Sequence, residues 1–448
     1  MQSAQDSLIH EATSLFRLVE SIDIFVAEHE NLFSYTEATQ AFFLHIHDQA
    51  AVTRNSVSDI IEKLAQAPEH AAPRYRRELI IHKDRWRTLH TYIKPATDAH
   101  TLNLPSPLIQ MATEDLRRIP GMEGTAVVVL LTPELMYYHN TPQSRPPSQL
   151  AFVEVPYSQG PSFFTNLTIY HELGHYVYDS LADSYNQSTA FTALVAAMSR
   201  AFDDMFDESL KTPSTRTWAK RVLDAWTKEV FCDLFALRHL GPAFSFALID
   251  MLSLIGLMEE ETEVKFDAEH PATALRLREQ LTRLRDDGWW AEVQDLPSEH
   301  VSLIARVAGK SESDYFFEFA EKRLPAFTEA FLTIVPFIHA LVSDVTPHCK
   351  SAAEDFSRRR LEIEDCFLHG VVPSKLLAEG EASSPTQVSM INAAYCFYLT
   401  LLPKLMDKLE GQESYNLIHR KKWIEKLEAW TMKGIEDHQL LTATAATQ

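Results

Sequence analysis

Glycine is scarce in this chain, with only 12 glycines among its 448 residues. Glycine makes up about 7% of an average protein, and its freedom to adopt positive φ angles serves tight turns and bulges. Long helices, in contrast, disfavour glycine. The scarcity therefore argues against a turn-rich β fold and for long helices. Because 448 residues exceed what one compact core usually spans, we expect two or three domains.

The apolar spacing predicts helices with one small exception. From about residue 5 to 100, apolar residues recur three and four positions apart, as in SLFRLVESIDIFVAEHENLF, which is typical of amphipathic helices. The helical pattern returns after about residue 300. Between these regions, the β-branched run Thr125–Leu131 and the run Leu150–Val155 are predicted strands. The expected fold class is mainly α, with a small α+β core.

These patterns divide the chain into three expected regions. We predict an N-terminal helical region at 1–104, a core with a small sheet at 105–299, and a C-terminal helical region at 300–448. The segment AEGEASSPTQ, at 378–387, is the clearest internal linker.

Charge and hydropathy exclude several classes of function. The net charge of −21 makes a nucleic-acid partner unexpected, because such proteins need a basic surface. The most apolar run, AFTEAFLTIVPFIHALVSDV from Ala326, is interrupted by Glu329, Pro336 and His339, so we expect a buried core helix and no membrane insertion. The N-terminus has acidic residues early and no apolar signal region. We therefore expect a soluble, cytoplasmic protein.

The cysteines give no metal or disulfide signature by themselves. None of the four forms a CxxC pair, and their spacing is irregular. We expect buried free thiols. The four are Cys232, Cys349, Cys366 and Cys396.

The segment YHELGHYVYDSL, at 170–181, carries the strongest chemical signal. On a helix, His171 and His175 share a face and could hold one metal ion, while Glu172 lies at the edge of that face, where it could reach a water. A third histidine of the HxxGxxH type is absent, because Tyr178 and Leu181 stand at the relevant positions. Two hydrogen-bonded histidines on an ordinary helix are the alternative.

A third ligand is predicted in WTKEVFCDLFALRHLGPAF, from Trp226. Glu229 and Asp233 lie one helical turn apart, and Ala236 follows on the same stripe, where a small residue allows two helices to approach. We predict that Glu229 binds the metal and that Asp233 accepts a hydrogen bond from a ligand histidine, with His171 preferred. Solvent-facing acids are the alternative, but the apolar surroundings predict a buried helix, where unpaired acids are costly.

A third patch, EHPATALRLREQL, begins at Glu269. His270 and Pro271 precede a predicted helix that contains Arg276. His270 could stabilise a developing oxyanion, and Arg276 could brace the groups behind the metal ligands. A proline-initiated helix with an unrelated histidine is the alternative.

The order HExxH, ExxxDxxA, HPxxxxR resembles that of the glutamate-type (gluzincin) zinc metallopeptidases, in particular the CAAX-prenyl endopeptidases and the heat-shock membrane zinc proteases. The likeness covers roughly residues 150–280. It implies one catalytic Zn²⁺ ion, a protein or peptide substrate, and a gluzincin-like core flanked here by helical regions. In that family the edge strand before the zinc helix binds the substrate backbone, which assigns this role to Leu150–Val155. Those relatives carry membrane helices and this chain is not expected to, so we do not expect a membrane-bound substrate.

The resulting hypothesis is a soluble zinc-dependent endopeptidase. His171, His175 and Glu229 would hold Zn²⁺, Glu172 would be the general base, and His270 would assist as a catalytic residue. One alternative is a zinc amidohydrolase that acts on a small peptide-like substrate. Another is a helical interaction or scaffold protein with a structural zinc site.

Overall fold

The structure is a computed structural model, and it is mainly helical, as the sequence predicts. The chain folds into two compact units. Unit 1 comprises 1–117 and 121–161, and unit 2 comprises 118–120 and 162–448. The structure describes residues 4–29, 37–101, 106–132, 138–140, 150–156, 162–183, 188–205, 213–254, 269–308, 324–349, 352–374, 385–410 and 417–446.

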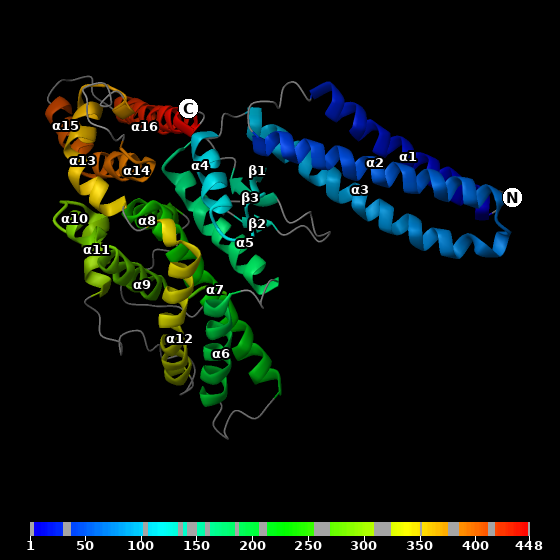
Figure 1. The fold of residues 1–448 in the computed structure, drawn as a ribbon, viewed down its shortest axis with the longest axis horizontal. Coiled ribbons are helices and arrows are strands. Elements are labelled where there is room, and N and C mark those ends of the chain that lie inside the picture. Colours follow the sequence, from blue (N-terminus) through cyan, green and yellow to red (C-terminus); the bar gives the residue numbers. More distant parts are fainter. Residues whose placement is uncertain are drawn as a thin grey trace. The chain divides into compact units, whose positions relative to one another are not determined.

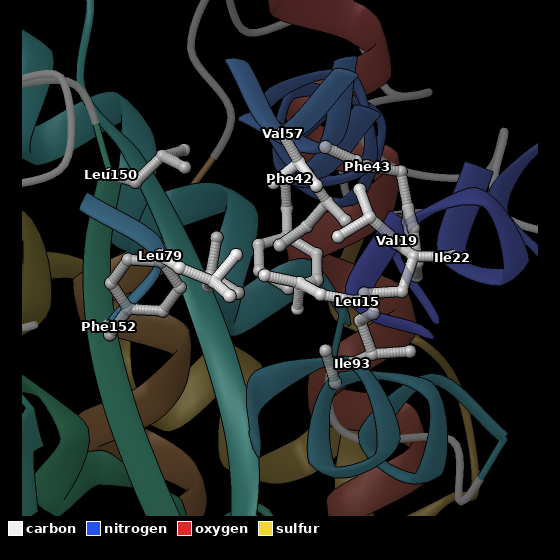
Figure 2. Close-up of a cluster of buried hydrophobic side chains, with 14 of the residues drawn as sticks. Leu15, Val19, Ile22, Phe42, Phe43, Val57, Leu79, Ile93, Leu150 and Phe152 are labelled. Atoms are coloured by element: carbon white, nitrogen blue, oxygen red, sulfur yellow. The ribbon is translucent and has the colours of Figure 1, made fainter. Parts of the chain in front are cut away.

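Unit 1 is built on three long helices that run side by side (Figure 1). They are followed by a shorter helix, α4. Apolar residues on the facing sides of the three helices pack into a common core. Leu15 of the first helix, Phe42 of the second and Leu79 of the third are members of it (Figure 2). The repeat of three and four positions explains why these segments are helical and why they associate. The helices are α1 (Ala4–His29), α2 (Glu37–Gln66), α3 (Ala72–Thr101) and α4 (Ser106–Arg117).

The sheet of unit 1 has three strands in the order β1-β3-β2. β1 (Ala126–Thr132) and β3 (Leu150–Pro156) match the two predicted strands and pair in parallel. β2 (Tyr138–Asn140) pairs with β3 in the antiparallel sense. The sequence-based expectation that β3 is an edge strand is therefore wrong, because β3 has a neighbour on each side. The segment between β2 and β3, at 141–149, lies outside the described residues.

The strands belong to the same core as the N-terminal helices. Val128 and Leu130 of β1 and Phe152 of β3 lie in one hydrophobic cluster with α1, α2 and α3. Phe152 stacks on Tyr92 of α3, with ring centroids 5.3 Å apart. The strands and the N-terminal helices thus share one hydrophobic core within unit 1.

Unit 2 contains the remaining helices. Helix α6 lies in the sequence between the HExxH segment and the segment that contains Glu229 and Asp233. The segment at 375–384, which covers most of the predicted linker, lies outside the described residues. The helices are α5 (Ile169–Asp183), α6 (Thr189–Met205), α7 (Pro213–Leu240), α8 (Pro242–Leu254), α9 (Thr273–Asp286), α10 (Trp289–Val293), α11 (Glu299–Ala308), α12 (Leu324–Val345), α13 (Ala352–Leu368), α14 (Gln387–Cys396), α15 (Leu402–Glu410) and α16 (Leu417–Ala446).

Helix α7 is central to unit 2, because it packs against α5, α8, α9, α12 and α14. Val230, Phe231 and Leu234 are essentially inaccessible to solvent, as predicted for a buried helix. Gly241 ends the helix: it has a φ of +63°, and its N–H donates to the Leu237 carbonyl at 2.7 Å. Glycine adopts this left-handed conformation without a steric penalty, and Pro242 then starts α8.

The most apolar helices of unit 2 are core elements. The apolar run from Ala326 lies in α12, where Phe331, Ile334 and Ile338 are fully buried. One described stretch, Gln387–Met406, is long and apolar enough to cross a membrane by length and composition, and 61% of it is buried inside the protein. Asn392 in this stretch donates to the Leu240 carbonyl at 2.8 Å. Its partners in other helices are typical of a buried core helix.

Candidate metal centre

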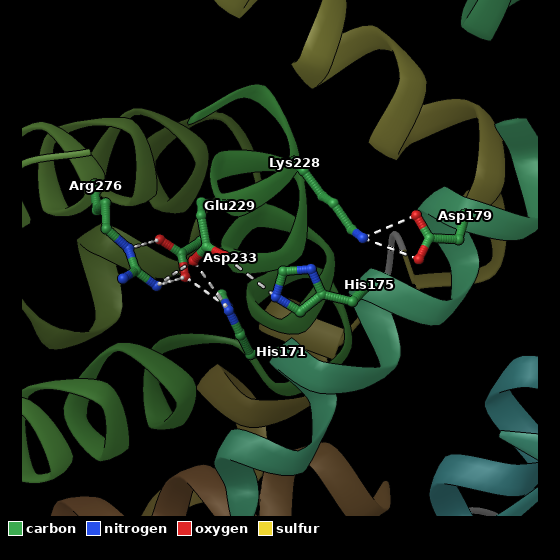
Figure 3. A network of polar contacts seen from close by, with 7 residues as sticks. All are labelled: His171, His175, Asp179, Lys228, Glu229, Asp233 and Arg276. Atoms are coloured by element: carbon green, nitrogen blue, oxygen red, sulfur yellow. Dashed lines mark hydrogen bonds and ion pairs between the residues drawn. The ribbon is translucent and has the colours of Figure 1, made fainter. Parts of the chain in front are cut away.

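The two histidines of the HExxH segment share one face of α5, as the helical spacing predicts. The ring centroids of His171 and His175 are 5.0 Å apart, with the rings at 84° to each other. Both side chains point toward α7 (Figure 3). A helix brings residues four apart into this neighbouring arrangement, so a single ion can reach both imidazoles.

The approach of α5 to α7 depends on Gly174. A Cβ atom at this position would lie 2.7 Å from the Cα of Cys232 and 3.0 Å from its Cβ. These are backbone and near-backbone atoms, so no larger residue fits unless a helix moves. The small residue at this contact is thus Gly174 of α5. Ala236 of α7, the small residue predicted to allow the approach, is also fully buried.

Glu229 lies between the two imidazoles. Its Oε2 is 3.3 Å from Nε2 of His171, and its Oε1 is 3.3 Å from Nε2 of His175. Nitrogen and oxygen donors that bind zinc tetrahedrally at about 2.0–2.1 Å lie about 3.3 Å from each other. The spacing of these donors therefore fits a common zinc ion. Oε2 of Glu229 is also buried and accepts no hydrogen bond in proper geometry from the described residues, which leaves it available to a cation.

Asp233 contacts Nδ1 of His171, the ring nitrogen that does not face Glu229. Its Oδ1 lies 3.0 Å from Nδ1 of His171. The two Asp233 oxygens also accept hydrogen bonds of 2.7 Å each from Arg276 of α9. Arg276 in addition lies 3.7 Å from Oε2 of Glu229. The carboxylate thus fixes the imidazole with Nε2 directed at Glu229, and α9 supplies the cation that supports it (Figure 3).

Interactions between neighbouring charged groups outweigh burial in setting the pKa values of His171, Glu229 and Asp233. Burial alone would lower the pKa of His171, but the Glu229 carboxylate and the hydrogen bond to Asp233 raise it to about 10. Burial opposes the ionisation of Glu229, yet His171, His175 and Arg276 hold the pKa of its carboxyl well below the usual range. The pKa of Asp233 is likewise lowered, against the effect of burial, by Arg276 and His171. Glu229 and Asp233 therefore stay ionised although they are buried, and their negative charge favours a positive charge at His171.

Cys232 is a further donor in the same place. Its Sγ and one ring nitrogen from each of His171 and His175 all lie within 4.8 Å of one another. Burial, with the nearby Glu229 carboxylate, raises the pKa of the Cys232 thiol well above its usual range. A thiol binds metal as the thiolate, so Glu229, which is already ionised, is the better third ligand.

Glu172 lies next to these donors without taking part in their contacts. The residue is 8% exposed, and within the described residues its carboxylate forms no hydrogen bond or ion pair. A carboxylate beside the candidate ligands is in the position that a general base for a bound water would occupy.

The structure brings five of the seven predicted site residues into one contact network, with Glu172 beside it. His270 lies in the bend before α9, with a half-buried side chain. Sequence reasoning missed the ion pair between Lys228 and Asp179, whose Nζ–Oδ1 distance is 2.8 Å and which links α7 to α5. It also missed Gly174 and Cys232. A glycine inside a helical segment was the available signal for a close approach.

No family model, curated protein or solved structure matches this chain.

Proposed function

We propose that this protein is a zinc-dependent endopeptidase with a gluzincin-like core formed by α5, α7 and α9. The observation that carries the proposal is the convergence of Nε2 of His171, Nε2 of His175 and the Glu229 carboxylate, with 3.3 Å between each imidazole and that carboxylate. The buried Glu172 carboxylate beside them supports a catalytic site, because a structural zinc site does not need a base.

In this proposal, each residue has a separate task. His171, His175 and Glu229 hold one Zn²⁺ ion, and Asp233 with Arg276 keeps His171 in the tautomer that offers Nε2. The chemistry that the bound ion supplies is that of a Lewis acid, which polarises a carbonyl and makes water acidic enough to lose a proton near neutral pH.

Glu172 carries the proton. Its carboxylate takes a proton from the water that attacks the peptide carbonyl carbon, and it returns that proton to the nitrogen of the leaving amine. His270 donates a hydrogen bond to the carbonyl oxygen as this oxygen gains negative charge. The substrate in this proposal is a protein or peptide, and the reaction takes place in the cytoplasm.

Cys232 favours a second candidate, a helical interaction protein with a structural zinc site. Its buried thiol lies with the two histidines, and cysteine and histidine are the usual ligands of structural zinc. A zinc amidohydrolase with a small peptide-like substrate would use the same residues as the endopeptidase and differs only in substrate.

The substitution Glu172→Gln tests the proposal, because it removes the base and leaves the ligands in place. We expect zinc content and thermal stability near those of the wild type, and turnover lower by about 10²-fold or more. The readouts are metal analysis and mass spectrometry of new N-termini in a proteome digest. Glu299→Gln, at an exposed position at the start of α11, is the matched control and should cleave normally.

The outcomes separate the candidates. A Glu172→Gln variant that binds zinc and cleaves proteins like the wild type contradicts the endopeptidase proposal. If the wild type cleaves no protein but hydrolyses small amides, the amidohydrolase is correct. If neither substrate class is hydrolysed while zinc is held firmly, the structural site is correct.

A further inference from the structure

A second group of metal-binding side chains lies at the C-terminal end of α7. His239 is in the last turn of that helix. His348 and Cys349 belong to η5 (Pro347–Cys349), the short 3-10 turn after α12. One donor atom from each of the three residues lies within 4.8 Å of the other two. None of these residues takes part in the cluster around Glu229.

The distances within this group fit a tetrahedral ion. Sγ of Cys349 is 3.6 Å from Nδ1 of His239. A sulfur bound to zinc at about 2.3 Å and a nitrogen bound at about 2.0–2.1 Å lie about 3.6 Å apart in a tetrahedral site. A thiol–imidazole hydrogen bond would explain this one distance as well. It would not explain the third donor, His348, whose ring centroid is 5.4 Å from that of His239.

The fold holds one donor rigidly and exposes the others. His239 is 2% exposed, and its ring packs against Phe235 at 4.6 Å and Tyr170 at 5.5 Å between centroids. His348 is exposed and Cys349 is half-buried. The buried imidazole of His239 gives an ion a preorganised ligand. The more accessible donors of His348 and Cys349 give it a route of entry.

We propose that His239, His348 and Cys349 form a second transition-metal site, of the zinc class, that fastens η5 to the end of α7. Two imidazoles and a thiolate are borderline-to-soft donors, which select Zn²⁺ or copper over Ca²⁺ and Mg²⁺. Three protein ligands leave the fourth position to water.

The second site is separate from the candidate catalytic site. His239 follows Glu229 by ten residues on the same helix, which corresponds to about 15 Å along the helix axis. Paired catalytic metals are about 3.5–4 Å apart. An ion at this second site therefore does not share a substrate with the first, and its effect is on the junction of α7 with the α12–α13 connection.

Cobalt(II) distinguishes the two sites, because only a thiolate ligand gives an intense near-ultraviolet charge-transfer band. We expect the wild type to bind two Co²⁺ ions per chain and to show this band. Cys349→Ser should lose the band and one equivalent of metal, and His348→Ala, at an exposed position, should weaken binding of the same equivalent. Circular dichroism checks that each variant is folded.

Three variants serve as controls. Cys366→Ala removes a buried thiol elsewhere in unit 2, and Glu229→Gln disrupts the first cluster, so both should retain the thiolate band. Cys232→Ala should retain it too. The proposal is overturned if the wild type shows no band, if the band survives Cys349→Ser, or if the band disappears in Cys232→Ala instead.

Discussion

Oδ1 of Asp233 accepts a hydrogen bond from Nδ1 of His171 across 3.0 Å, and the same carboxylate accepts two from Arg276 at 2.7 Å. Asp233 therefore orients His171, a proposed metal ligand, and is also the counterion of a buried guanidinium. These two roles have different consequences when the residue is changed. Loss of support affects metal affinity, whereas loss of the counterion affects folding.

We expect Asp233→Asn to weaken zinc affinity by about 10–100-fold, because the imidazole is no longer oriented by a carboxylate. The metal-free variant should also be less stable, by up to about 3–5 kcal/mol, because Arg276 loses its two 2.7 Å contacts to a carboxylate and keeps only Glu229, at 3.7 Å. Zinc competition assays measure the first effect and urea unfolding the second.

The double variant Asp233→Asn, Arg276→Gln separates the two roles. It also removes the guanidinium that has lost its nearest counterion, so we expect it to recover part of the lost stability without recovering zinc affinity. If Asp233→Asn alone matches the wild type in both measurements, the carboxylate does not support the metal site.

The identity of the third ligand is tested by comparing Glu229→Gln with Cys232→Ala. Glu229 is held in its ionised form by the surrounding cations, whereas burial raises the pKa of the Cys232 thiol. We therefore expect Glu229→Gln to lose most of the zinc of the first site and Cys232→Ala to retain it. Metal analysis after dialysis gives the answer, and the reverse result would assign the third ligand to Cys232.

The helix contact at Gly174 predicts a third effect. Gly174→Ala places a methyl group 2.7 Å from the Cα of Cys232, so α5 and α7 must separate. Overpacking of this kind costs about 1–3 kcal/mol, and displacement of the helices should also reduce zinc affinity.

Gly434 in α16 offers a matched helical control, because a Cβ there would meet Sδ of Met390 at 2.8 Å. A methionine side chain can adjust, so Gly434→Ala should cost less and leave metal binding unchanged. Urea unfolding and zinc competition compare the two variants. Equal effects would show that the Gly174 contact does not set the site.

Some features of this protein are encoded locally and could be predicted. Apolar spacing identified the helices, β-branched runs identified β1 and β3, and the helical repeat placed His171 beside His175 and Glu229 beside Asp233. Those patterns involve residues close in sequence, where the geometry of one element fixes their arrangement.

The features that escaped prediction all depend on contacts between distant segments. The short strand β2 turns β3 into a central strand, and the sheet shares a core with the N-terminal helices. Cys232 and Cys349 were expected to be simple buried thiols, yet Cys349 is half-buried and both lie with histidines in potential metal-binding groups. Their partners are brought to them by helix packing, which sequence spacing does not reveal.

Asp355 predicts a pH-dependent contribution to stability away from the metal centre. Its Oδ2 accepts hydrogen bonds from the Thr386 N–H at 2.9 Å and the Ser389 hydroxyl at 2.7 Å, at the start of α14, and its Oδ1 accepts one from Arg358 at 3.0 Å. Burial would raise the pKa of Asp355, but these hydrogen bonds lower it overall.

A carboxyl whose pKa is lower in the folded state stabilises the protein fully above its unfolded pKa of about 3.9, and this stabilisation disappears as the pH falls through the folded value. Asp355→Asn should therefore cost about 1.5–3 kcal/mol at pH 6, the range for hydrogen bonds to a charged group, and progressively less below pH ~4. Urea unfolding of metal-free protein across this range measures the difference, since acid would otherwise release metal.

Asp365→Asn, at an exposed position on the same helix, is the control and should show no comparable pH-dependent loss. A constant difference between Asp355→Asn and the wild type from pH 6 to pH 3 would mean that the ionised carboxylate does not stabilise the start of α14.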